Sequence, residues 1–213
     1  MATDLGKDAV SNRPTRLPRD QRRIQLLDAA SEVFAAKGYH AAAMDDIAEL
    51  AGVSKPVLYQ HFPSKRALYV ELIEDTGRLL LGTLAEATGR AATGRERVEL
   101  GFRAYFRFAV DNRPAFRLLL STVMRSDAEF ERIVEEILDA VAETISTLIE
   151  IPASDEQRLV LASALVGMAE SVSRKALQDS GDIDADELAH WIAELAWFGL
   201  RGVRTDPEAP TRD

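Results

Sequence analysis

The residues of this sequence best suited to chemistry gather within residues 45–65, and their types suit contact with nucleic acid. Amide and ammonium groups can bond base edges in the major groove of DNA, and a branched aliphatic side chain can contact a thymine methyl. Hydroxyl, imidazole and ammonium groups can bond phosphates, which fix the position of a protein on DNA without reading its sequence. The candidates are Lys55, Val57 and Gln60 for bases, Tyr59, His61 and Lys65 for phosphates, and Pro56 on the same outer face.

A run of arginines precedes this segment. Between residues 13 and 23, five arginines stand against the single acidic residue Asp20. A basic arm of this kind binds a phosphate backbone, and we count Arg22 among the candidate DNA contacts. A solvated, disordered tail would have the same composition, so the run alone leaves both interpretations open.

Charge is distributed unevenly along the chain. The formal net charge of −9 would by itself disfavour a polyanionic partner, because like charges repel. Residues 1–66 nevertheless hold 10 basic and 8 acidic side chains, a net charge of +2, whereas residues 67–213 hold 16 and 27, a net charge of −11. We therefore expect the first part to face nucleic acid and the acidic part to face away from it.

Several classes of protein are excluded by what the sequence lacks. With no cysteine, the chain has no disulfides, no cysteine-ligated zinc and no thiol nucleophile. The three histidines, His40, His61 and His190, are too far apart in sequence for a local metal site. No G-x-S-x-G, P-loop, H-E-x-x-H or dinucleotide-binding glycine pattern is present. We expect no metal, no cofactor and no enzymatic activity.

The sequence gives no sign of a membrane segment. The longest nearly unbroken apolar stretch, residues 159–169, is shorter than the roughly 18 to 20 residues that span a bilayer. The first residues lack the apolar centre of a secretory signal. We expect a soluble cytoplasmic protein with a sizeable core, since 46% of its residues are hydrophobic.

Apolar residues recur every three to four positions along most of the chain, which predicts an all-α fold of about nine helices. Gly38 and Gly52 favour helix ends, while Ser54 and Pro56 favour a helix start. Capping-box patterns begin at Thr93, Ser126 and Ser154. The expected helices are residues 18–37, 44–50, 54–62, 64–87, 95–112, 114–124, 127–149, 155–179 and 185–202, with flexible ends at 1–17 and 205–213.

The two short helices expected at 44–50 and 54–62, joined by a glycine turn, have the spacing of a helix-turn-helix. In that motif the second helix enters the major groove, so its outer face would carry the candidate residues. Short helical pairs with a glycine turn also occur in proteins that bind no DNA, where Tyr59 and His61 would be ordinary half-buried residues. The apolar positions that can pack on Leu27 and Phe34 of the first helix are Ile47, Ala48, Ala51, Val53, Leu58 and Phe62.

Residues 22–73 resemble the DNA-binding domain of the TetR/AcrR family of bacterial transcriptional repressors. The motifs that carry the resemblance are F-x-x-K-G-Y at 34–39, D-I-A at 46–48, A-G-V-S at 51–54 and L-Y-x-H-F-x-S-K at 58–65. The resemblance implies an all-α homodimer on a palindromic operator, with Tyr59, His61 and Lys65 at phosphate-contact positions and Lys55, Val57 and Gln60 at base-reading positions. The segments RLPRDQRR at 16–23, GYHAAAMD at 38–45 and GVSKPVLYQHF at 52–62 also look similar to actinobacterial members that sense long-chain acyl-CoA and control fatty-acid synthesis.

One departure from the family pattern lies before the second helix. The family often has Ser or Thr there, whose hydroxyl caps the helix, but this chain has Ala43 followed by Met44. We expect Asp45 to stabilise the helix start, although a carboxylate cannot replace a donor to phosphate.

By resemblance, residues 67–204 hold an apolar ligand pocket and a dimer interface, following a DNA-binding domain at 18–66. The same apolar residues would equally fill a solid core, which sequence cannot distinguish from a pocket. Two long apolar helices commonly form a four-helix bundle across a twofold axis. The pocket candidates are Phe102, Tyr105, Phe106, Phe116, Leu120, Met124, Phe130 and Ile137, and the interface candidates are Leu161, Leu165, Met168, Trp191, Leu195 and Phe198.

These expectations describe a repressor that releases a palindromic operator of double-stranded DNA when it binds a small apolar effector, a class that includes lipid-like molecules. Two alternatives remain open. One is an activator of the same family that senses long-chain acyl-CoA or a fatty acid, and the other is a helical interaction module that binds no DNA.

Overall fold

The computed structural model describes residues 17–121, 127–178 and 184–202. Within these ranges the chain is built of helices and contains no strand, so the prediction of an all-α fold is confirmed. The expected tails before residue 17 and after 204, and the turn at 179–182, lie outside the described residues. The helices are α1 (Arg19–Ala41), α2 (Met44–Leu50), α3 (Lys55–His61), α4 (Lys65–Gly89), α5 (Gly94–Asp111), α6 (Arg113–Leu119), α7 (Ala128–Ser146), α8 (Asp155–Gln178) and α9 (Ala185–Gly202).

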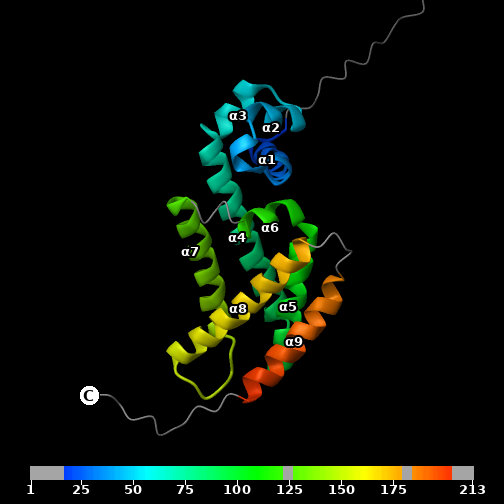
Figure 1. Ribbon diagram of the computed structural model, residues 1–213, viewed down its shortest axis with the longest axis vertical. Helices are drawn as coiled ribbons and strands as arrows, with labels where there is room; N and C mark the ends of the chain where they lie inside the picture. The colour runs from blue at the N-terminus through cyan, green and yellow to red at the C-terminus, as the bar shows by residue number, and fades with distance from the viewer. Residues whose placement is uncertain (1–16, 122–126, 179–183, 203–213) are drawn as a thin grey trace, which may run out of the picture.

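The helices form two groups joined by α4. Figure 1 shows α1, α2 and α3 together at one end, with α4 running from them into the larger group formed with α5 to α9. At 25 residues, α4 is about 38 Å long. Helix α6 packs against both α1 and α4, so it is a second contact between the groups.

The core of the first group forms as the apolar spacing predicts, with one exception. Leu27, Phe34, Ile47, Leu58 and Phe62 are all buried. Ile24 lies three residues before Leu27, a spacing that predicts a place on the same buried face of α1, but it is 59% exposed. The buried stripe of α1 is centred on Leu26, Leu27, Ala30, Val33 and Phe34, and at 100° per residue Ile24 lies outside it.

Helix ends follow local chemistry. Gly38 (φ 75°) and Gly52 (φ 64°) adopt positive φ angles that other residues rarely tolerate. Gly52 follows the end of α2 as expected, whereas Gly38 forms a kink within α1, which continues to Ala41. Ser64 caps α4 by accepting the N–H of Ala67 at 3.1 Å. Ser154 and Gln157 form a complete capping box, with reciprocal bonds of 3.2 and 2.9 Å.

Other helix ends differ from expectation. The hydroxyl of Ser54 makes no capping bond to α3. Thr93 accepts the N–H of Glu96, but the Glu96 carboxylate bonds Ala92 instead of completing the box. Helix α7 is capped by Asp127, which accepts the N–H groups of residues 129 and 130, whereas Ser126 lies outside the described residues.

Two helices end before the expected positions 124 and 149. After Leu119 and after Ser146 the backbone tightens into turns with i to i−3 hydrogen bonds, such as Ser121 to Leu118 and Leu148 to Ile145. Such turns satisfy carbonyls that the helix end leaves free. None of the helices in the described ranges is long and apolar enough to cross a membrane.

Candidate nucleic-acid interface and effector cavity

Helix α3 presents the predicted contact residues on one outer surface. Leu58 and Phe62 are buried and fix the helix against the first group, which leaves the opposite side in solvent. Tyr59, with 48% of its surface exposed, is an unusually open aromatic side chain. Lys55, Pro56, Tyr59 and Gln60 are exposed, and Val57 and His61 are half-buried.

The first residue of α3 is paired with the preceding helix. Lys55 Nζ lies 2.5 Å from Asp45 Oδ2, and this hydrogen bond raises the pKa of Lys55. Asp45 lies in the first turn of α2, as expected, but makes no hydrogen bond that caps the helix. Asp46 caps it instead, because its Oδ2 accepts the N–H of Ala43 at 3.1 Å. Asp46 also pairs with Lys37 at 2.9 Å, and the Lys37 and Ala43 hydrogen bonds lower its pKa.

Positive charge gathers beside the last turn of α3. Partial burial lowers the pKa of His61, and the charges of Arg19, Arg22 and Arg23 lower it further. The start of α1 thus lies close enough to α3 for its arginines to act on His61. A surface with these groups side by side suits a phosphate backbone.

Arg22 also belongs to a chain of contacts that orients α1. Its Nη1 donates to Gln25 Oε1 at 2.6 Å, and Gln25 Nε2 donates to the carbonyl of Ala51 at 2.9 Å. The arginine is therefore linked to the turn between α2 and α3.

Lys65, a predicted phosphate contact, makes hydrogen bonds within the chain. Its ammonium donates to the carbonyls of Tyr39, His40 and Ala42 at 2.8, 3.1 and 2.9 Å, and it lies 4.8 Å from the centre of the Tyr39 ring. All three ammonium donors are used within the chain. Lys65 ties the end of α1 to the start of α4.

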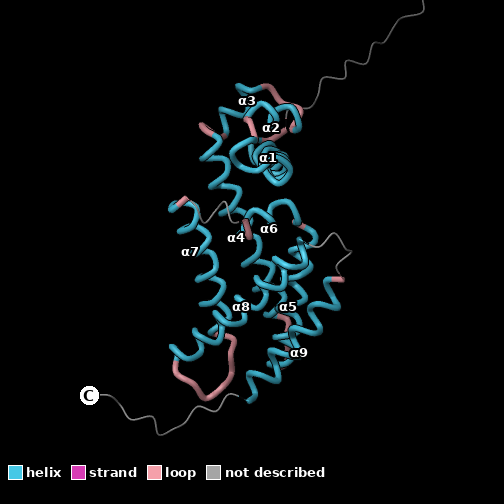
Figure 2. The backbone as a smooth tube through the Cα atoms, in the orientation of Figure 1, coloured by secondary structure: helices cyan, strands magenta, loops and turns pink. Residues whose placement is uncertain are grey.

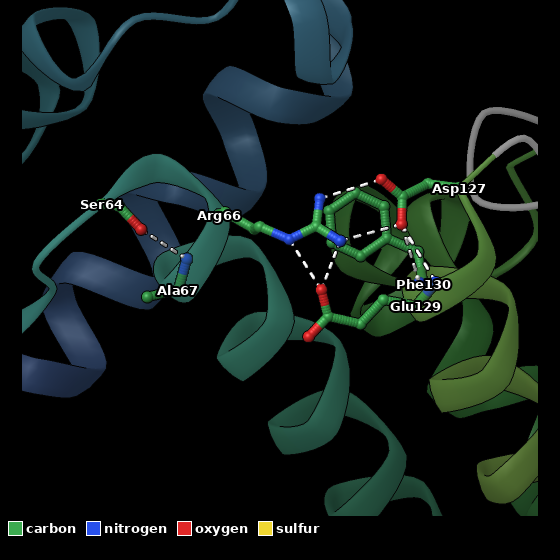
Figure 3. Close-up of polar contacts among 6 residues, drawn as sticks. All are labelled: Ser64, Arg66, Ala67, Asp127, Glu129 and Phe130. Atoms are coloured by element: carbon green, nitrogen blue, oxygen red, sulfur yellow. Dashed lines mark hydrogen bonds and ion pairs between the residues drawn. The ribbon is translucent and has the colours of Figure 1, made fainter.

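A cluster around Arg66 joins the start of α4 to the start of α7 (Figure 3). The guanidinium donates to both carboxylate oxygens of Asp127 at 2.9 Å and to Glu129 at 2.7 Å. These bonds raise the pKa of Arg66 and lower that of Asp127 to about 2. Paired, bidentate contacts of this kind fix orientation as well as distance.

Phe130 belongs to the same junction and not to the pocket predicted for it. Its ring lies 4.5 Å from the Arg66 guanidinium and contacts the rings of Tyr39 and Tyr69, with centroids 5.3 and 5.0 Å away. Because α7 begins at Ala128, Phe130 in its first turn faces the first group of helices. The aromatic contacts thus join α1, α4 and α7.

A cavity of about 530 Å³ lies within the larger group. Of the predicted pocket residues, Phe102, Tyr105, Phe116, Leu120 and Ile137 line it. Phe106 is buried beside Phe102 and Tyr105 but does not line the cavity, since it follows Tyr105 on α5 and points to another side. Met124 lies outside the described residues.

Much of the lining comes from residues that the sequence did not single out as pocket residues. Apolar spacing identifies buried faces, but it cannot show whether a face meets another side chain or an empty space. The three consecutive leucines at 79–81 were the sequence feature that could have indicated this lining, because they continue the apolar face of α4 beyond the part that packs in the first group of helices. The additional apolar residues include Leu80, Leu84, Val98, Val134, Leu138, Leu165 and Trp197.

The predicted interface residues separate into two sets. Trp191, Leu195 and Phe198 are 57%, 61% and 62% exposed and share one face of α9. Leu161 and Met168 are half-buried, and Leu165 is buried and lines the cavity. The outer face of α8 carries smaller exposed residues instead, among them Val160, Ala164 and Gly167.

Comparison with known proteins agrees with this architecture. Residues 26–72 match the family described as bacterial regulatory proteins, tetR family, and residues 95–199 match the tetracyclin repressor-like C-terminal domain. The transcriptional activator FasR of Mycolicibacterium smegmatis is 35% identical over 195 residues, covering 91% of this chain and 89% of FasR. The fatty acid metabolism regulator protein of Bacillus subtilis is 26% identical, covering 54% of this chain and 59% of that protein.

A solved structure extends the comparison to the whole fold. A TetR-like transcriptional regulator from Rhodococcus sp. RHA1 superimposes with a TM-score of 0.73 at 32% identity, covering 88% of this chain and all of that chain. The prediction of a regulator and not an enzyme is confirmed, because these relatives are transcriptional regulators. The chain therefore belongs to the TetR family of bacterial transcriptional regulators.

Proposed function

We propose that the chain is a cytoplasmic homodimeric repressor that binds a palindromic operator through α3 and releases it when a small apolar effector enters the cavity. The observation that carries this proposal is the course of α4. Its first residue follows the α3 surface, and its later residues Leu80 and Leu84 line the cavity. One continuous helix thus connects the candidate DNA surface with the candidate effector site.

The form of the cavity supports a chain-like effector. The lining residues of α5 extend from Gly94 to Tyr105, about 16 Å along the helix axis. Its volume is within the range of ligand pockets, and most of its lining is aliphatic or aromatic. We therefore include fatty acids and acyl-CoA among the candidate effectors, consistent with the similarity to the fatty acid metabolism regulator protein of Bacillus subtilis.

The exposed faces of α8 and α9 support a homodimer. Trp191, Leu195 and Phe198 would leave a contiguous apolar surface in water in a monomer. A second copy related by a twofold axis would cover it with the same surface, and small residues such as Gly167 on α8 would allow close helix approach. In such a dimer each α3 would read one half-site, with half-sites about 34 Å apart.

Selection of genomic fragments with the purified full-length protein tests the DNA-binding part of the proposal. We expect recovery of a palindromic sequence, with affinity that falls as salt concentration rises. Recovery of no preferred sequence would contradict it and favour the alternative of an interaction module without DNA binding. Fatty acids and acyl-CoA are then added to the complex, and unchanged operator affinity at full cavity occupancy would contradict the proposed release.

A second candidate is an activator of the same architecture. The observation that favours it is the 35% identity to FasR, a transcriptional activator. Transcription in vitro from the selected operator distinguishes the two, because a repressor lowers the rate of transcript formation and an activator raises it.

A further inference from the structure

The two ends of the cavity differ in exposure and in charge. The end beside α6 is closed by buried side chains, among them Phe102, Tyr105 and Phe116. The other end is formed by the first residues of α5, the last of α9 and the loop between α7 and α8, where the lining residues are half-buried or exposed. Figure 2 shows this loop at the end of the molecule away from α1, α2 and α3. The cavity therefore opens on the side remote from the candidate DNA surface.

Charged residues are concentrated at this open end. Arg97 and Arg201 belong to the lining here, together with the carboxylate of Glu150. The other carboxylate of the lining, Glu170, pairs with Arg174. The first turn of α5 also lies here, and the positive end of a helix dipole favours an anion. The guanidinium of Arg201 stands 5.7 Å from the centre of the Trp197 ring, which leaves its polar edge available to a ligand.

Arg97 and Glu150 differ strongly in exposure. Arg97 Nη1 lies 2.7 Å from Glu150 Oε1 and 3.4 Å from the carbonyl of Leu148. The side chain of Arg97 is only 21% exposed, whereas that of Glu150 is 70% exposed. A half-buried guanidinium needs an anionic partner more than an exposed carboxylate does, because water can solvate the carboxylate when the pair separates.

We propose that the effector is an amphipathic anion, with its hydrocarbon chain in the apolar part of the cavity and its anionic head on Arg97. Glu150 occupies the place of that head in the unliganded protein and moves into solvent when the effector binds. A guanidinium suits this exchange because its planar fork bonds carboxylate and phosphate oxygens equally well. The inference rests on the proposed role of the cavity as the effector site.

The anionic head has two possible sources, the carboxylate of a free fatty acid and the phosphates of an acyl-CoA. Binding of dodecanoate, dodecanoyl-CoA and the neutral dodecanol to the full-length protein separates them. Trp197 lines the open end, so its fluorescence can report occupancy. We expect at least one of the two anions to bind about tenfold or more tightly than dodecanol, since a charge-assisted hydrogen bond is lost with the alcohol. The tighter anion identifies the source.

Three variants test the role of Arg97. Arg97→Gln should reduce affinity for the preferred anion to that for dodecanol and leave dodecanol binding unchanged, which also shows that the cavity is intact. Arg95→Gln is the matched control, because Arg95 lies on the same helix but pairs with Glu99 and Glu194 outside the cavity lining. Glu150→Gln removes the competing carboxylate and should tighten anion binding by up to about fivefold.

Three results would overturn the inference. Equal affinity for dodecanol and both anions would contradict the role of Arg97 but not the proposal that the cavity is the effector site. An anion preference that survives in folded Arg97→Gln, with thermal unfolding as the check on folding, would assign the head to another site. Failure of all three ligands to bind would overturn the inference and the lipid-like effector class together.

Discussion

Replacing Gly77 with alanine should destabilise the protein, although alanine normally favours a helix. Gly77 is buried on α4, where a Cβ atom would lie 2.7, 2.8 and 2.9 Å from Cδ1, Cγ1 and Cγ2 of Ile137 on α7. No single rotation of Ile137 removes all three contacts, because two of these atoms are bonded directly to its Cβ. The helices must separate, or Ile137 must move within the cavity that it lines.

The expected magnitude follows from two opposing effects. Alanine in place of glycine inside a helix contributes about 0.8 to 1 kcal/mol of stability. Overpacking of a core typically costs about 1 to 3 kcal/mol. The matched control is Gly82→Ala on the same helix, where nothing lies within 4 Å of the added Cβ. The control should raise the melting temperature by about 2 to 4 °C, and Gly77→Ala should melt about 2 to 12 °C below the control.

Calorimetric or circular-dichroism melts of the single variants and of the double variant Gly77→Ala with Ile137→Ala measure this effect. Ile137→Ala removes all three crowded atoms, so the double variant should be more stable than the sum of the single changes implies. If Gly77→Ala and Gly82→Ala raised the melting temperature equally, the close approach of α4 and α7 would be refuted.

Four further predictions concern the surfaces and junctions. Lys65→Met should lower the free energy of unfolding by at least about 1 kcal/mol, because three carbonyls lose their donor; denaturant titration measures it, and an unchanged midpoint would contradict the structural role. The pKa of His61 is lowered in the free protein and should rise when DNA phosphates lie beside the imidazole. Operator affinity should therefore increase as the pH falls from above the pKa of His61 in the complex to below its pKa in the free protein. Fluorescence anisotropy measures this dependence, and His61→Gln should abolish it. Leu195→Glu should give monomers in analytical ultracentrifugation, whereas the same change at the exposed Leu79 on α4 should not. Arg66→Gln should leave the affinity of the free protein for effector unchanged but reduce the ratio of operator affinity without effector to operator affinity with effector. An unchanged ratio would show that the Arg66 contacts do not couple the two sites.

The fold was predictable from sequence because its signals are local. Helix α2 has the expected ends, and the positive φ of Gly52 lies where the glycine turn was expected. The details that sequence did not predict are those in which a neighbouring side chain makes the hydrogen bond in place of the expected one. Asp46 bonds the start of α2 while Asp45 pairs with Lys55, a choice that depends on where α3 lies in space. Judged by sequence spacing alone, Asp45 and Asp46 are equally well placed to bond the start of α2.

The candidate sites were predictable only in part, for a different reason. The outer face of α3 could be derived because its inner face is fixed by two large apolar residues, Leu58 and Phe62. The cavity could not be derived from the sequence, since the helices around a cavity and those around a packed core have the same apolar pattern. Phe130 and Leu165 show this limit, because the first packs at the helix junction and the second lines the cavity instead of an interface.

The position of the cavity opening constrains how an effector can act on DNA binding. A ligand entering beside Arg97 comes in at the end remote from α3, so it cannot displace DNA directly. Its effect must pass along α4 and α7, which line the cavity and meet again at Arg66, or through α6, which carries Phe116 into the cavity and packs on α1. The first route ends at the first turn of α4, where Lys65 also holds the end of α1, the helix that α6 contacts on the second route. Variants at Arg66 and Lys65 should therefore alter coupling more than variants of equal stability cost elsewhere on α4.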